Sequence, residues 1–152
     1  MWRGWFAEPL KPGEAAPEFA LSDETGRLVR LSELRGRSVV LVFYPGDETP
    51  GCRAQLCEFR DKWAAAEKQG VAVFGVNPQS AASHARFRRR HGFPFPLLED
   101  RGQKVARLYH ADGPIVRRTV YVIGPDGAIR YARRGRPPVE EVLAAAGAAR
   151  AV

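Results

Sequence analysis

Residues 39–52 read VVLVFYPGDETPGC and end on the first of the two cysteines of the chain. The first six residues are an uninterrupted apolar run, which is typical of a central strand buried on both faces. A helical pattern follows Cys52, so this cysteine is expected at the N-terminus of a helix that directly follows the strand. Backbone N–H groups and the helix dipole favour negative charge there, so the position predicts a reactive thiol.

The hydrophobic periodicity predicts strands that alternate with helices. The predicted strands are residues 19–21, 28–31, 39–44, 71–76, 119–123 and 128–132, the predicted helices are 52–69, 81–91 and 137 onward, and shorter segments are expected at 32–36, 95–98 and 103–108. This order favours an α/β fold with a central mixed sheet, helices on both faces and an N-terminal β-hairpin. Residues 1–152 are expected to form a single domain, with residues 1–16 as an irregular lead-in.

Composition limits the classes of function. No apolar run approaches the length of a membrane span, and the N-terminus lacks the features of a signal peptide, so a cytoplasmic protein is expected. In that compartment, two cysteines are more typical of reactivity than of a structural disulfide. The net charge of +7 includes arginine clusters at residues 86–90 and 130–136. Nucleic-acid binding is one interpretation, but no nucleic-acid module signature accompanies the charge, which favours solvated surfaces.

Cys52 and Cys57 are the only cysteines, and four residues separate them. On one intact helix their Cα atoms would stand roughly 8–9 Å apart, whereas a disulfide needs Cα atoms within about 7 Å. A bond between them would therefore require the start of the helix to unwind, which favours a reversible redox pair over a structural disulfide. A zinc site is disfavoured because the histidines, His84, His91 and His110, show no ligand spacing. We expect no metal and no cofactor.

The residues upstream of Cys52 form the pattern P-x-x-x-T-x-x-C. Pro45 lacks an N–H group and would shape the wall of the loop. Thr49 lies three positions before Cys52, and its hydroxyl can both accept and donate within reach of the sulfur. Gly51 would let the backbone approach a ligand closely. These residues are the candidate site.

With this pattern the chain resembles the Q-type peroxiredoxins, also called the bacterioferritin comigratory protein family. The resemblance is carried by residues 42–52 with Cys57, and by segments similar to the family's pattern at 16–19, 91–100 and 117–123. The last of these resembles the strand that carries the family's active-site arginine. Counting back from Tyr121, which takes the place of the usual phenylalanine, that arginine is Arg118.

The resemblance implies a thioredoxin-like fold and a thiol-dependent peroxidase activity toward hydrogen peroxide and organic hydroperoxides. Cys52 would be the peroxidatic cysteine and Cys57 the resolving cysteine, with Pro45, Thr49 and Arg118 completing the peroxide pocket. Thioredoxin or a similar dithiol would be the reductant. Family members are mostly monomeric, so a monomer is expected, with no nucleic-acid or membrane partner.

The chain departs from the family pattern at a few positions. Gly46 stands where lysine is usual, Glu48 replaces a commonly aromatic or polar residue, and residues 77–79 replace a common serine-x-aspartate turn. These changes leave the peroxide preference open, and we expect the Glu48 side chain to point to solvent. The alternative is a thioredoxin-like protein disulfide oxidoreductase. That class spaces its cysteines two residues apart, and it would leave Thr49 and Arg118 without a role.

Overall fold

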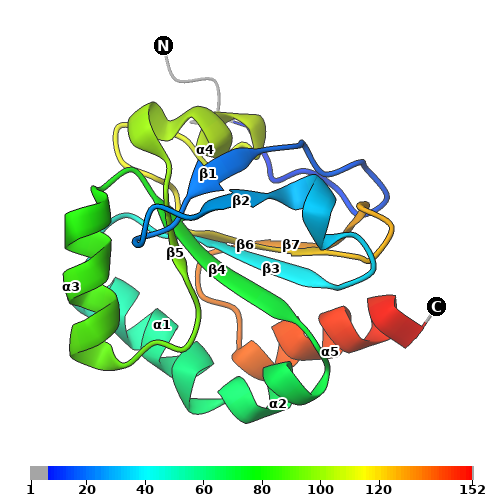
Figure 1. Ribbon diagram of the computed structural model, residues 1–152. Helices are drawn as coiled ribbons and strands as arrows, with labels where there is room; N and C mark the ends of the chain where they lie inside the picture. The colour runs from blue at the N-terminus through cyan, green and yellow to red at the C-terminus, as the bar shows by residue number, and fades with distance from the viewer. Residues whose placement is uncertain (1–6, 152) are drawn as a thin grey trace.

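The computed structural model describes residues 7–151 of the chain (Figure 1). The strands are β1 (Ala20–Ser22), β2 (Leu28–Arg30), β3 (Val39–Phe43), β4 (Ala72–Asn77), β5 (Leu97–Glu99), β6 (Thr119–Ile123) and β7 (Ile129–Arg134). The α-helices are α1 (Pro50–Asp61), α2 (Trp63–Lys68), α3 (Ala81–His91), α4 (Lys104–Leu108) and α5 (Val139–Ala151), and 3-10 turns cover Leu31–Leu34 and Arg101–Gln103. Of the predicted lead-in, residues 1–6 lie outside the described part, and residues 7–16 contain neither a helix nor a strand.

The main sheet has five strands in the order β5-β4-β3-β6-β7. β3 runs parallel to β4 and antiparallel to β6, so the sheet is mixed, as predicted. Every residue of β3 is buried, because the strand lies in the middle of the sheet and both of its faces are covered. Val40 and Val42 face a core shared with α1, α3 and α5, while Leu41 and Phe43 face a second core under the β1–β2 hairpin and α4. Figure 1 shows these two layers on opposite sides of the sheet.

The register of the sheet decides which distant segments meet near Cys52. β3 and β6 are antiparallel, and Phe43 at the end of β3 pairs with Thr119 at the start of β6. The loop that leaves β3 therefore lies beside the residue that precedes β6, which is Arg118. Two segments more than sixty positions apart in sequence are brought together by a single pair of neighbouring strands.

One predicted element was wrong. A single helix was expected from Cys52 to about Gln69, but α1 ends at Asp61 and α2 begins at Trp63, with non-helical backbone angles at Lys62 (φ −107°, ψ 17°). No glycine or proline marks this break. Beyond it, Trp63 packs against Phe95 with ring centroids 6.1 Å apart, and Ala66 is buried in the core. The break redirects the chain so that the second segment also keeps its apolar side chains on the sheet.

The other predicted elements are confirmed to within a few residues, including the N-terminal hairpin and the C-terminal hairpin of β6 and β7. α3 begins after Ser80, whose side chain accepts a hydrogen bond from the Ser83 N–H, and ends at Gly92 in the left-handed conformation. Within residues 7–151, no helix combines the length and the apolar character that a membrane crossing requires.

Candidate active site

Cys52 lies in the first turn of α1, where the sequence placed it. Thr49 is the N-cap residue, Pro50 occupies the first helical position, and the Arg53 N–H donates to the Thr49 carbonyl over 2.8 Å. N–H groups of a first turn have no partner within the helix, and they favour negative charge. Cys52 is fully buried, at 0% exposure. The sulfur is therefore held at the positive end of a helix and away from bulk water.

Arg118 is the polar partner of this sulfur. Its Nη2 lies 3.3 Å from Cys52 Sγ, and its Nη1 donates to Gln55 Oε1 over 2.7 Å. Gln55 is itself buried, and it holds the guanidinium in the orientation that aims the second nitrogen at sulfur. Arg118 was predicted from the sequence, and Gln55 was not. The available signal was its spacing, because a residue three positions after Cys52 lies on the same face of the helix.

Gly51 makes room for the guanidinium. A Cβ atom at this position would stand 3.2 Å from Arg118 Nη2. We expect Gly51→Ala to displace the end of the flexible arginine side chain from sulfur and to slow oxidation of Cys52 by peroxide about 3–10-fold, since small misplacements at a reacting centre are costly. The melting temperature should stay the same or rise, because alanine favours helix more than glycine does. A variant that is as fast as wild type in stopped-flow oxidation would contradict this close-approach role.

Thr49 and Pro45 lie in the loop between β3 and α1. Pro45 is half-buried and starts the loop, and the Thr49 hydroxyl donates to the Gly46 carbonyl over 3.1 Å. From the sequence, this hydroxyl was expected within reach of sulfur; the polar contact found for it is with the Gly46 carbonyl. Because its proton is engaged on Gly46, the lone pairs of Thr49 Oγ1 are left to accept a hydrogen bond from another molecule.

Cys57 is on the same helix as Cys52, half-buried, and both thiols are free. α1 is continuous through both positions. In such an intact helix, as predicted from the sequence, the two Cα atoms stand roughly 8–9 Å apart, which is too far for a disulfide. Bond formation between them would need the first turns of α1 to open.

The three departures from the family pattern lie in the loop before Cys52 or in contact with it. A Cβ atom on Gly46 would stand 3.1 Å from Gln79 Oε1, which accepts a hydrogen bond from the Asp47 N–H. The glycine and the glutamine therefore fit together. Glu48 is exposed, with φ of 64°, and its carboxylate lies 3.1 Å from His91 Nε2 and 3.7 Å from Arg90 Nη1. Its charge is thus balanced by the end of α3.

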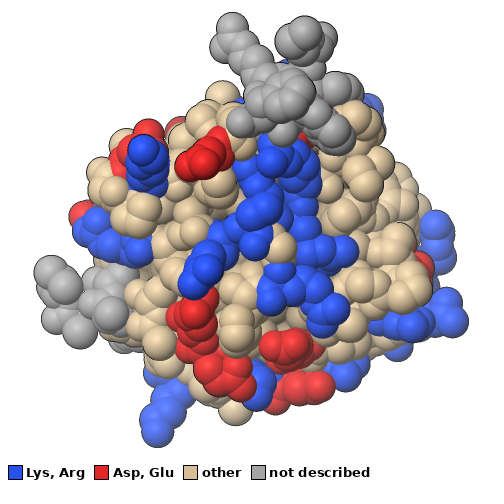
Figure 2. All heavy atoms as spheres, turned by 180° about the vertical axis from the view of Figure 1, so that it is seen from behind, with Lys and Arg blue, Asp and Glu red and all other residues tan. Residues whose placement is uncertain are grey.

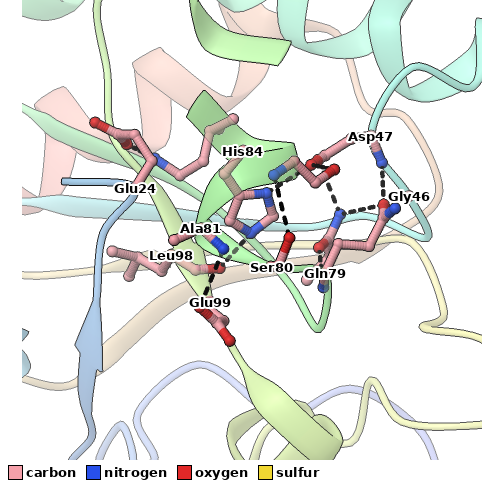
Figure 3. Close-up of polar contacts among 12 residues, drawn as sticks. Glu24, Gly46, Asp47, Gln79, Ser80, Ala81, His84, Leu98 and Glu99 are labelled. Atoms are coloured by element: carbon pink, nitrogen blue, oxygen red, sulfur yellow. Dashed lines mark hydrogen bonds and ion pairs between the residues drawn. The ribbon is translucent and has the colours of Figure 1, made fainter. Parts of the chain in front are cut away.

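A buried polar cluster under the loop was not predicted. Asp47 Oδ2 lies 2.7 Å from His84 Nδ1, and His84 Nε2 lies 3.1 Å from the Leu98 carbonyl oxygen (Figure 3). Both side chains are almost completely excluded from solvent. From the sequence, His84 was considered only as a possible metal ligand. Nothing in its local sequence indicates that a carboxylate 37 positions earlier points at its ring.

Arginine and lysine side chains form a band across one face of the molecule, with acidic groups along its lower edge (Figure 2). Three arginines of β7 are engaged within the chain. Arg130 Nη2 lies 2.5 Å from Asp126, Arg133 Nη2 lies 3.5 Å from Glu141, and Arg134 Nη1 donates to Thr119 Oγ1 over 2.7 Å. These contacts support the interpretation of the charge as part of a solvated surface.

Comparison with known proteins gives evidence that is independent of this geometry. A sequence profile described as the AhpC/TSA family matches residues 12–132. A chloroplastic peroxiredoxin Q from Oryza sativa subsp. japonica is 45% identical over 126 residues, which is 80% of this chain and 58% of the rice protein. The chain thus spans less than two thirds of the length of this curated relative.

Solved structures are also similar. The crystal structure of the peroxidoxin BcpB from Mycobacterium tuberculosis superimposes with a TM-score of 0.85 at 30% identity, over 91% of this chain and 97% of that one. A bacterioferritin comigratory protein from Xanthomonas campestris, whose structures concern alkyl peroxide reduction, superimposes with a TM-score of 0.81 at 27% identity, over 86% and 90% of the two chains. The thioredoxin-like fold expected from the sequence is confirmed by these neighbours.

Proposed function

Because the chain belongs to the AhpC/TSA family, and within it to the peroxiredoxins of the Q type, we propose that it is a thiol-dependent peroxidase that reduces hydrogen peroxide and organic hydroperoxides through Cys52. The observation that carries this proposal is the contact of Arg118 Nη2 with a fully buried Cys52 sulfur at a helix N-terminus. A buried, cation-paired sulfur suits a small peroxide. It suits a protein disulfide poorly, because thiol–disulfide exchange needs an accessible thiolate.

The first step is nucleophilic. The Cys52 thiolate attacks one peroxide oxygen, the O–O bond breaks, and the second oxygen leaves as hydroxide or alkoxide and takes up a proton. Sulfur is oxidised to the sulfenic acid and the peroxide is reduced to water or an alcohol. Arg118 would stabilise the charge that develops on the leaving oxygen, and Thr49 Oγ1 would accept from the peroxide O–H group. Pro45 would close the wall of this pocket.

The second step uses Cys57. Its sulfur displaces water from the Cys52 sulfenic acid and forms a Cys52–Cys57 disulfide once the start of α1 has unwound. A dithiol reductant then returns both thiols by exchange, with thioredoxin as the reductant we propose. We further propose that the protein works as a monomer in the cytoplasm, where such reductants keep thiols reduced.

Arg118→Ala tests whether the reaction is peroxide reduction of the proposed kind. We expect the second-order rate constant for oxidation of Cys52 by hydrogen peroxide to fall about 10²–10³-fold, the usual loss when one preorganised donor to a developing anion is removed. Stopped-flow fluorescence, or competition with a coloured haem peroxidase, measures this constant directly.

The matched control is Arg133→Ala, which removes an arginine of β7 that pairs with Glu141. It should leave the rate constant within about twofold of wild type, since surface ion pairs contribute little. If wild type consumes neither hydrogen peroxide nor an organic hydroperoxide in the presence of a dithiol, the proposed function is wrong. If both arginine variants are equally fast, the role given to Arg118 is wrong.

A further inference from the structure

Asp47 is the central acceptor of the buried cluster under the loop. Its Oδ1 accepts from the Tyr44 hydroxyl over 2.6 Å and from Asn77 Nδ2 over 3.2 Å, and its Oδ2 accepts from Ser83 Oγ and from His84 Nδ1, each over 2.7 Å. These donors come from the residue directly after β3, the end of β4 and the first turn of α3. A single carboxylate in the loop is therefore tied to β4, to α3 and to the residue that follows β3. Figure 3 shows Asp47 beside His84.

The contacts indicate which groups of the cluster donate and which accept. The Leu98 carbonyl can only accept, so His84 Nε2 carries a proton. Four donors surround the Asp47 carboxylate, which is the pattern of the ionised form. Burial alone would raise the pKa of Asp47, but hydrogen bonds from His84 and Tyr44 outweigh burial and the pKa is lowered. His84 Nδ1 faces Asp47 Oδ2, so the ring and the carboxylate form a buried hydrogen-bonded pair.

The position of this pair connects it to the reacting sulfur. Asp47 lies two residues before Thr49 and five before Cys52, in a loop that belongs to neither the sheet nor the helix. The residue after it, Glu48, has a left-handed backbone with φ of 64° and is exposed. The buried pair thus holds the last point of the loop that is anchored in the core, directly before the segment that must unwind.

We propose that His84 is a positioning residue, which holds Asp47 and through it the 45–49 loop in the conformation that the peroxide step requires, and which sets the point from which α1 unwinds. This inference rests on the proposed peroxidase function. The His84 ring does not touch sulfur; it acts on the placement of Thr49 and of the first turn of α1. Removing the ring would leave the buried Asp47 carboxylate without one of its two contacts at Oδ2.

The two chemical steps should then respond differently. Oxidation of Cys52 needs the intact helix start, with Arg118 and Thr49 placed around sulfur. Resolution by Cys57 needs the same segment to open. A looser anchor therefore slows the first step and leaves the second step as fast as before, or faster. Loss of folded protein alone would lower the active fraction and leave both rate constants of the folded molecules unchanged.

The test compares two substitutions of one ring. In His84→Asn, the new amide nitrogen takes the place of Nδ1 and can still donate to Asp47. In His84→Gln, the new amide nitrogen takes the place of Nε2 and faces the Leu98 carbonyl. We expect His84→Gln to lower the rate constant of Cys52 oxidation about 10–100-fold, and His84→Asn to lower it less. The matched control is His110→Gln, since His110 contacts the Glu8 carbonyl and lies outside this cluster.

Both steps are followed by rapid quenching and mass spectrometry, which separates thiol, sulfenic acid and disulfide. Support requires slower oxidation in His84→Gln than in His84→Asn, with unslowed resolution. The inference is overturned if His84→Gln oxidises as fast as His110→Gln, or if oxidation and resolution slow by the same factor. If His84→Gln does not fold, Asp47→Asn replaces it. Oxidation of Cys52 at the wild-type rate in Asp47→Asn would then also overturn the inference. Absence of peroxide reduction by wild type would instead refute the proposed function.

Discussion

Cys52→Ser is expected to reduce peroxide consumption to the uncatalysed rate. The serine hydroxyl would have to lose its proton to become a nucleophile, and the polar partner found at this position is Arg118, a cation that cannot accept a proton. Serine is nearly the same size as cysteine, so the buried position stays filled and the protein should remain folded. Peroxide consumption in the presence of a dithiol measures the loss, and the melting temperature verifies the fold.

The matched control for this substitution is Cys57→Ser, which removes the other thiol of the same helix. It should keep the rate constant of the first oxidation within about twofold of wild type, because the proposed chemistry gives Cys57 no role before the sulfenic acid forms. If Cys52→Ser consumes peroxide at the wild-type rate, Cys52 is not the nucleophile and the proposed function is wrong.

Cys57→Ser is expected to abolish turnover supported by thioredoxin while leaving a single oxidation event intact. Without Cys57 no intramolecular disulfide forms, so the Cys52 sulfenic acid persists in a fully buried position that a protein reductant does not reach. A small monothiol should restore slow turnover. Mass spectrometry of the peroxide-treated variant should find one added oxygen atom, where wild type loses two hydrogen atoms.

This result would also separate two routes of resolution. If Cys57→Ser turns over with thioredoxin as fast as wild type, the sulfenic acid is resolved by another molecule and α1 need not unwind. In wild type, blocking the opening of α1 should have the same consequence as removing Cys57. The reason is geometric, since Cα atoms roughly 8–9 Å apart in an intact helix cannot carry a disulfide.

Much of the fold follows from local patterns. The apolar run 39–44, the periodicity of 81–91 and the turn residues of the two hairpins each determine an element through contacts with near neighbours in sequence. For the same reason, the position of Cys52 in the first turn of a helix was predictable, and so was its separation from Cys57. The break at Lys62 was not, because it depends on how Trp63 packs against Phe95, a residue from a different part of the chain.

The amino-acid sequence predicts the candidate nucleophile, its helix and the family pattern that points to Arg118. The contacts that hold these groups in place arise only in the folded chain. The antiparallel register of β3 and β6 brings Arg118 to sulfur, Gln55 orients the guanidinium, and the His84–Asp47 pair ties the loop to the core. How strong these contacts are depends on burial, and whether they form at all depends on which distant segments lie side by side. Neither is encoded in a local pattern, because each appears only once the sheet has formed.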